Sequence, residues 1–116
     1  MRDTLTTGIE NEASYEVTRE LSAPHLPRVV LATPAMIGMI EGTCLRAVAP
    51  HLDEGETTVG THVCVSHQAA ALEGEEIVIR CRLTDVTKRR LTFDVTVDTP
   101  NARISEGTHE RAVVKV

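Results

Sequence analysis

The chain has 116 residues, which is enough for one domain, and we expect that domain to span residues 1–116. Twelve basic and seventeen acidic residues give a net charge of −5, and aromatic residues make up 2% of the chain. This composition argues against bulk attraction to nucleic acid or to an anionic membrane, and it leaves no aromatic platform for stacking bases.

The start of the chain is predicted to be irregular except for one short strand. Residues 1–11 are polar and contain no apolar run, which predicts a flexible arm. Residues 13–20 predict a short strand. Pro24 and Pro27 indicate a loop over residues 21–28, because proline interrupts regular structure.

The clearest predicted element is a helix that begins near Thr33. Threonine is an N-cap residue type, and Pro34 follows at the first helical position, where the missing N–H of proline costs nothing. Ala49 precedes Pro50, which predicts the end of the helix. Apolar residues recur between these limits at helical spacing: Met36, Ile37, Ile40, Cys44, Ala47 and Val48.

Four strands are predicted after the helix. They cover residues 59–71, 77–84, 91–98 and 104–116. Each long strand has one apolar face, as is typical of an antiparallel sheet that covers a core on one side. The sequence therefore predicts an α+β domain in which an antiparallel sheet is wrapped around one long central helix. A second copy would cover the unpaired sheet edges, so we expect a homodimer.

The three cysteines, Cys44, Cys64 and Cys81, lie far apart, and each stands in an apolar stretch. Because their number is odd and no CxxC pair is present, we predict neither a disulfide framework nor a zinc site. We expect reduced, buried thiols in a cytoplasmic protein. No apolar stretch approaches the length that spans a bilayer, and no metal or cofactor motif is present.

Glu41 interrupts the apolar stripe of the predicted helix. It lies four residues after Ile37 and three before Cys44, so helical spacing places it on the buried face. A carboxylate there must be paired, protonated or functional, which makes it a candidate base or nucleophile. The alternative is a carboxylate at the edge of the stripe that reaches water or pairs with Arg46.

His67 is the second unusual residue. Strict alternation puts it on the same face as three valines of its strand, the face that should meet the helix, and puts His62 on the solvent face. A single inward histidine is more often a hydrogen-bonded core residue than a catalyst. Opposite a helix that carries Glu41, however, it would be able to share a proton or activate water. Because His62 and His67 face opposite ways, they make a poor metal pair.

Several other positions have structural explanations. The hydroxyl of Thr33 is explained by capping. Gly60, inside a strand, predicts a bulge or an exposed amide. Alternation from Ile104 places Arg111 on the outer face, unless Gly107 holds a bulge that changes the phase. The basic residues 88–90 predict a solvated turn, with a contact to the phosphate of an anionic ligand as the alternative.

Three sequence segments occur in a fixed order: VLATPAMIGMIEGTCLRAVAP (30–50), LDEGETTVGTHVCVSHQAA (52–70) and GTHERAVV (107–114). Together they resemble the fluoroacetyl-CoA thioesterase family of hotdog-fold proteins. The resemblance implies a dimer that binds acyl-CoA at the subunit interface. It implies that Thr33, Glu41 and His67 are catalytic, that Gly60 lies beside the thioester, and that Arg111 contacts the substrate, contrary to strict alternation. The implied reaction is hydrolysis of a short acyl-CoA thioester without a cofactor.

One segment departs from the family. Its fluoroacetyl-specific member carries phenylalanines in a lid before the catalytic threonine, whereas the corresponding segment here, PHLPRVV (24–30), is shorter and has no aromatic residue. We therefore expect a thioesterase of broader acyl specificity. Two alternatives stay open: a hotdog hydratase acting on enoyl-CoA, and a non-catalytic acyl-CoA-binding protein.

Overall fold

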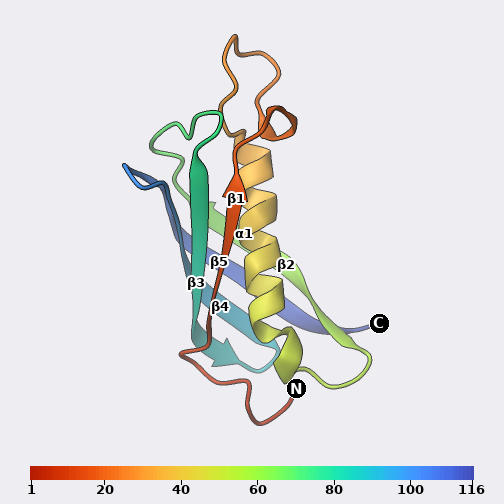
Figure 1. Cartoon of the computed structure of the whole chain (residues 1–116). Coiled ribbons are helices and arrows are strands. Elements are labelled where there is room, and N and C mark those ends of the chain that lie inside the picture. Colours follow the sequence, from red (N-terminus) through yellow and green to blue (C-terminus); the bar gives the residue numbers. More distant parts are fainter.

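The computed structural model describes residues 1–116, and in it five strands form one antiparallel sheet that curls around a single long helix (Figure 1). The strands are β1 (Glu10–Glu16), β2 (Glu56–Val65), β3 (Glu76–Thr87), β4 (Arg90–Asp98) and β5 (Arg103–Lys115), and the helices are η1 (Arg19–Leu21), α1 (Thr33–Val48) and η2 (Ala49–His51). The strand order across the sheet is β1-β3-β4-β5-β2. The predicted α+β architecture is therefore confirmed. No helix is long and apolar enough to cross a membrane.

The core lies between the inner face of the sheet and α1. Alternation along β3 and β4 directs one set of apolar side chains inward: Ile77, Ile79, Cys81, Leu83, Leu91, Phe93, Val95 and Val97. The helix contributes Met36, Ile40, Cys44, Ala47 and Val48. The predicted periodicities of the helix and of these two strands are thus the ones that build the core.

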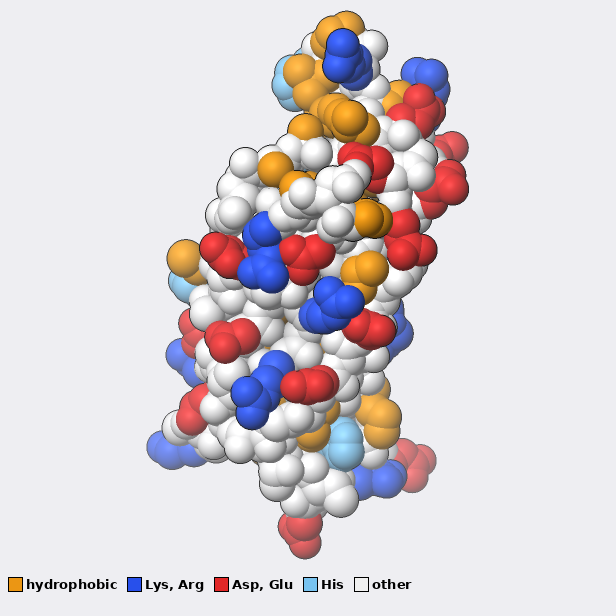
Figure 2. All heavy atoms as spheres, turned by 60° about the vertical axis from the view of Figure 1, so that its left-hand side comes forward, with side chains coloured by type: hydrophobic (Ala, Val, Ile, Leu, Met, Phe, Trp, Pro, Cys, Tyr) orange, Lys and Arg blue, Asp and Glu red, His pale blue; other side chains and the backbone are white.

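The outer face of the sheet is charged. Figure 2 shows positive and negative side chains interspersed over the side of the molecule on which β3 lies. Arg80 of β3 pairs with Glu12 of β1 at 3.0 Å and with Asp98 of β4 at 3.7 Å. Exposed ion pairs of this kind stabilise a protein by only about 0–1 kcal/mol each. Their main consequence is that this face stays polar.

The first nine residues pack against the domain, although their composition predicted a flexible arm. Leu5 is buried, and the amide of Arg2 donates a hydrogen bond to the carbonyl of His51 at 2.9 Å. The α-ammonium group of Met1 contacts the carboxylates of Asp53 and Glu56. β1 begins at residue 10, inside the expected arm, and ends at 16, earlier than expected. These contacts are made with residues about fifty positions away, which local composition does not reveal.

A one-residue bulge in β5 determines which side chains reach the core. Val97 pairs with Ser105 and Asp98 with Arg103, so Ile104 is an extra residue on β5. From Ser105 onward the odd-numbered residues face inward, and Arg111 is only 3% exposed. The outward placement of Arg111 by strict alternation is therefore wrong. The phase change occurs at Ile104 and not at Gly107.

A second bulge divides β2. Gly60 pairs with Arg111 and His62 with Glu110, so Thr61 is the extra residue. The bulge predicted from Gly60 is therefore present. It turns Val59 outward, where this side chain is 45% exposed, and His62 also faces solvent, as expected.

The thiols differ in exposure along the chain. Cys44 and Cys81 are buried as expected, whereas Cys64 is exposed. Cys64 lies on β2, an edge strand of the sheet. The expectation that all three thiols are buried is therefore wrong for Cys64.

Candidate active site

Thr33 and His67 form a pair at the N-terminal end of α1. The Oγ1 atom of Thr33 lies 2.7 Å from Nδ1 of His67. β2 ends at Val65, so His67 lies in the following loop, and its predicted place on the inner face of a strand over residues 59–71 is wrong. The N-cap of α1 is Ala32, and no side chain makes a capping hydrogen bond. The prediction that Thr33 caps the helix is therefore wrong. Its hydroxyl is engaged with the histidine instead.

A cavity of about 440 Å³ lies beside this Thr33–His67 pair. Its apolar lining comes from the loop before α1 and the loop after β2, and includes Leu26, Val30, Leu31, Ala32, Ala69 and Ala70. Thr33 and His67 lie in its wall. The cavity can therefore receive an aliphatic group next to the threonine hydroxyl.

Glu41 lies in a second group of side chains, further along α1. Its side chain is 40% exposed, and Oε2 lies 3.5 Å from Nη1 of Arg111. Glu41 thus lies at the edge of the apolar stripe and reaches water, which was the alternative, and its placement on the buried face is wrong. The alternative pairing with Arg46 is also wrong, because Arg46 donates a hydrogen bond to the hydroxyl of Tyr15 at 3.1 Å. A cationic partner on β5 therefore faces the carboxylate that helical spacing singled out.

Several hydrogen bonds hold the guanidinium of Arg111. Nε donates to Oγ1 of Thr58 at 2.7 Å, and Nη2 donates to the Thr58 carbonyl at 2.9 Å. Nη1 donates to Nε2 of His109 at 3.1 Å. Burial lowers the pKa of Arg111, and the negative charge of Glu41 acts in the opposite direction. The arginine thus presents its positive charge to Glu41 from a buried and fixed position.

Gly60 completes this second group because its backbone lies next to the Glu41 carboxylate. A Cβ atom at this position would lie 2.6 Å from Oε2 of Glu41 and 3.3 Å from Cε1 of His109. The backbone of β2 therefore lies directly against the carboxylate. We call Glu41, Gly60, His109 and Arg111 the glutamate cluster.

The Thr33–His67 pair and the glutamate cluster do not meet within one chain. Glu41 lies eight residues after Thr33 in α1, which is about 12 Å along the helix axis at 1.5 Å per residue. No hydrogen bond or ion pair joins Glu41 to Thr33 or to His67. A single chain therefore contains the predicted residues in two separate places.

Sequence reasoning missed His109 and Thr58. His109 is fully buried, and its ring is stacked on the ring of Phe93 with the two centroids 6.4 Å apart. It stands two residues before Arg111 on the same strand, so an inward arginine also implies an inward histidine. That implication was available from the resemblance. Thr58 gave no signal, because its role depends on the register between β2 and β5.

The basic turn at residues 88–90 has a structural role at one position. Arg89 donates a hydrogen bond to the carboxylate of Glu56 at 2.8 Å and another to the carbonyl of Val113 at 2.9 Å. These contacts hold the turn against β2 and β5. The alternative of a phosphate contact is therefore not needed to explain Arg89.

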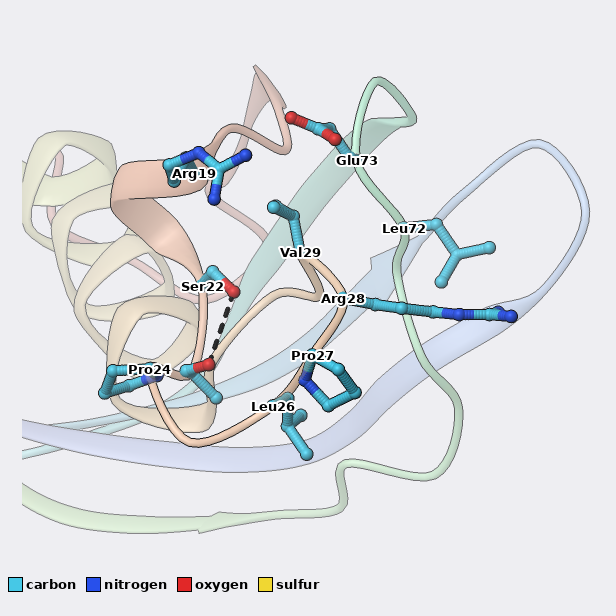
Figure 3. Close-up of a pocket in the computed structure, with 10 residues that line it drawn as sticks. Arg19, Ser22, Pro24, Leu26, Pro27, Arg28, Val29, Leu72 and Glu73 are labelled. Atoms are coloured by element: carbon cyan, nitrogen blue, oxygen red, sulfur yellow. Dashed lines mark hydrogen bonds between the residues drawn. The ribbon is translucent and has the colours of Figure 1, made fainter.

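A second cavity of about 510 Å³ also borders the loop before α1 (Figure 3). It is lined by η1, by that loop and by residues 72–73, with Arg19, Arg28 and Glu73 as its charged residues. In Figure 3 the side chain of Arg28 extends away from the neighbouring Pro27 and Leu26. Neither Thr33 nor His67 lines this cavity, so it is not part of the candidate site.

Solved structures identify the class of this fold. A fluoroacetyl-CoA thioesterase superposes with a TM-score of 0.91 and 33% identity, over 97% of this chain and 90% of that one. A variant of that enzyme in complex with fluoroacetate and CoA gives 0.90 and 33%, over 97% of each chain. A thioesterase superfamily member from Thermus thermophilus gives 0.89 and 24%, over 97% and 86%. The sheet wrapped around α1 is thus a hotdog fold, as predicted.

Sequence matches then identify the family. The model described as fluoroacetyl-CoA-specific thioesterase matches residues 13–116. The fluoroacetyl-CoA thioesterase of Streptantibioticus cattleyicolor is 42% identical over 85 residues, which are 73% of this chain and 61% of that protein. The matched part thus spans about three fifths of this relative's length. The chain belongs to the fluoroacetyl-CoA-specific thioesterase family.

Proposed function

We propose that this protein hydrolyses a short acyl-CoA thioester to the free acid and CoA. The observation that carries the proposal is the hydrogen bond between Thr33 and His67 in the wall of an apolar cavity. This hydrogen bond supports the proposal because a hydroxyl and an imidazole, two groups suited to thioester hydrolysis, line a cavity that an acyl group can enter. The names of the relatives support the same substrate class, and one of their structures contains CoA.

The chemistry follows from the two groups of residues. The Gly60 amide polarises the thioester carbonyl, as the donors of an oxyanion hole do. Glu41, held by Arg111, acts in one of two ways. It attacks the carbonyl carbon, the C–S bond breaks, and water then hydrolyses the resulting anhydride to the free acid; or it removes a proton from a water that attacks the carbonyl carbon directly, and the C–S bond then breaks. His67 transfers protons to the departing CoA thiolate, and Thr33 orients the imidazole. Metal ions and cofactors take no part in this scheme.

We further propose that the active form is a homodimer whose sites combine residues of both protomers. β2 is an edge strand, and Val59 and Val63 on it are 45% and 36% exposed. An unpaired edge with apolar side chains is suited to pairing with a second chain. Thr33 and Glu41 are too far apart along α1 to act on one thioester within a single chain, so a second chain is needed to bring the two groups together.

A two-fold axis would complete two sites at once. If the two α1 helices run antiparallel, an axis near residue 37 lies midway between Thr33 and Glu41. The Thr33–His67 pair of one protomer then faces the glutamate cluster of its partner. Gly38 suits the crossing point, because apart from its neighbours and the adjoining backbone of α1 no atom of its own chain lies within 4 Å of where its Cβ would be.

The acyl specificity is proposed to be broader than fluoroacetyl-CoA alone. The loop before α1 contributes Leu26, Val30 and Leu31 to the cavity beside Thr33, together with His25 but no phenylalanine, tyrosine or tryptophan. Flexible aliphatic side chains of this kind accept groups of different length more readily than a stack of aromatic rings does. Short straight and branched acyl groups are therefore the expected substrates.

The test is a thiol-release screen over acyl-CoA chain lengths. The wild-type protein is expected to release CoA from short-chain substrates. His67→Ala and Glu41→Gln are expected to lose on the order of 10²-fold or more in kcat, which is the usual contribution of acid–base groups. The matched controls are His51→Ala and Glu54→Gln, whose side chains lie outside both groups of site residues. Wild-type activity in Glu41→Gln would contradict the mechanism.

The same screen separates the alternative functions. Hydration of crotonyl-CoA without CoA release would identify an enoyl-CoA hydratase instead. Binding of acyl-CoA without turnover of any thioester would identify a binding protein. We place the protein in the cytoplasm, where its three free cysteines would stay reduced.

A further inference from the structure

We propose that His109 is a positioning residue, which fixes the Arg111 guanidinium opposite Glu41 through a single ring tautomer imposed by its two neighbours. His109 is fully buried on β5 and lines neither the cavity beside Thr33 nor the cavity of Figure 3. The mechanism above assigns it no step. The inference rests on the proposed thioesterase function, since it concerns the orientation of a residue in that site.

The two hydrogen bonds of the His109 ring define its tautomer. Nδ1 lies 2.7 Å from the carbonyl oxygen of His62, which only accepts hydrogen bonds, so Nδ1 carries the proton. Nε2 lies 3.1 Å from Nη1 of Arg111, and arginine only donates. Nε2 must therefore be unprotonated. A neutral ring in this one tautomer satisfies both partners, and the cationic ring does not.

The position of His109 connects it to both parts of the glutamate cluster. The His62 carbonyl that it binds follows Thr61, the extra residue of the β2 bulge. The Cε1 atom of the ring would be 3.3 Å from a Cβ at Gly60. His109 thus lies between the bulge that presents Gly60 and the guanidinium that faces Glu41. A change in this ring would alter both.

The neighbours of His109 keep its ring neutral. Burial lowers the pKa of His109, the hydrogen bond to the His62 carbonyl acts in the opposite direction, and the charge of Arg111 lowers it further. The titratable or charged groups that face it are Glu41 from α1, His62 from β2 and Arg111 from β5, while β4 contributes the apolar ring of Phe93. The acceptor for Arg111 is therefore present at neutral pH.

Two substitutions separate the two hydrogen bonds. The amide nitrogen of asparagine occupies the place of Nδ1, so His109→Asn keeps the donor to the His62 carbonyl and loses the acceptor for Arg111. The amide oxygen of glutamine reaches the place of Nε2, so His109→Gln keeps the acceptor and loses the donor. The pair is matched, because both side chains are neutral amides that differ by one methylene group.

If His109 is a positioning residue, the variant with the higher activity should be the one with the lower melting temperature. His109→Asn should lose about 10-fold to 100-fold in kcat with KM nearly unchanged, as expected for one lost hydrogen bond to a charged group. His109→Gln should stay within about threefold of the wild-type kcat. The melting temperature should instead be higher for His109→Asn, which keeps the bond between β2 and β5. Equal activities, or activities that follow the order of stability, would overturn the proposal.

A measurement on the unmodified protein decides the matter if a variant does not fold. Long-range ¹⁵N–¹H NMR at pH 7 should show His109 with a protonated Nδ1 and an unprotonated Nε2. A cationic ring or the opposite tautomer would overturn the proposal. This readout needs no turnover, so it is distinct from the thioesterase assay. A wild-type protein that hydrolyses no thioester refutes the proposed function and leaves the tautomer result unaffected.

Discussion

The Thr33 hydroxyl lies 2.7 Å from Nδ1 of His67, across the gap between the start of α1 and the end of β2. Ala32 is the N-cap residue, so Thr33 is the first residue inside the helix. The helix thus begins one residue earlier than predicted, and the Thr33 hydroxyl contacts a partner outside the helix instead of capping it. A residue whose type indicated a capping role is therefore available for chemistry.

Removal of the Thr33 hydroxyl should reduce activity without destabilising the protein. Thr33→Val should lower kcat by about 10-fold or more, because His67 loses the group that orients it. Thr33→Ser, which keeps the hydroxyl, should stay within about threefold of wild type. Loss of a true cap costs about 1 kcal/mol, or about 4–8 °C in melting temperature for a small domain. A fall of that size in Thr33→Val, measured by thermal unfolding, would restore the capping role.

A side chain at Gly60 should displace the carboxylate of Glu41. The Cβ of Gly60→Ala would lie 2.6 Å from Oε2 of Glu41, so one of the two groups must move. We expect a loss in kcat on the order of 10²-fold, which is typical of a misplacement of about 1 Å. If Gly60→Ala lowers kcat by displacing Glu41, then adding Gly60→Ala to the Glu41→Gln variant should lower kcat by less than about a further threefold. Additive losses in this double-mutant cycle would contradict that route.

Mixed dimers test whether two protomers share a site. Thr33→Val and Glu41→Gln homodimers are each expected to keep at most about a tenth of wild-type activity. After subunit exchange in equal amounts, about half of the dimers are mixed and each has one intact shared site, which gives about a quarter of wild-type activity. Thr33→Val mixed with His67→Ala is the control, because both changes affect the same pair. If the mixture of Thr33→Val and Glu41→Gln recovers no activity, each site lies within one protomer.

The anchored N-terminus should make stability depend on pH at low pH. The hydrogen bond from the Met1 ammonium, followed by those from the Asp53 amide and Arg89, lowers the pKa of Glu56 to about 2. A carboxyl with a lowered pKa stabilises the fold above its ordinary value of 4.5 and loses this effect as pH falls towards about 2. The melting temperature of Glu56→Gln should therefore lie below that of wild type above about pH 5 and approach it at lower pH. Glu54→Gln, at an exposed position, should show no such difference.

The sequence predicted well wherever hydrophobic spacing is regular. The apolar positions of α1, from Met36 to Val48, form its buried face, and β3 and β4 alternate strictly from residue 77 to 83 and from 91 to 97. Glu41 was singled out because helical spacing placed it in the apolar stripe of that helix, although its side chain lies at the edge of the stripe and is 40% exposed. These predictions depend on one element at a time, which is the information that periodicity contains.

Predictions failed where one extra residue changed the register between strands. The bulges at Thr61 and Ile104 exchange the inner and outer faces of β2 and β5, since side chains alternate with a period of two. Val59 and Arg111 were misplaced by alternation for this reason. The contact of Thr33 with His67 and that of Met1 with Glu56 join distant parts of the chain, and no local pattern contains them.

The bulge at Ile104 has a consequence for comparing related chains. Because Ile104 is the extra residue, a relative without it would join the pairs Val97–Ser105 and Asp98–Arg103 in a regular ladder and would keep His109 and Arg111 on the inner face. A gap at this position between two aligned chains is therefore no sign that the chemistry has been lost. An insertion or deletion between Ser105 and Arg111 is the change that would exchange the two faces along β5.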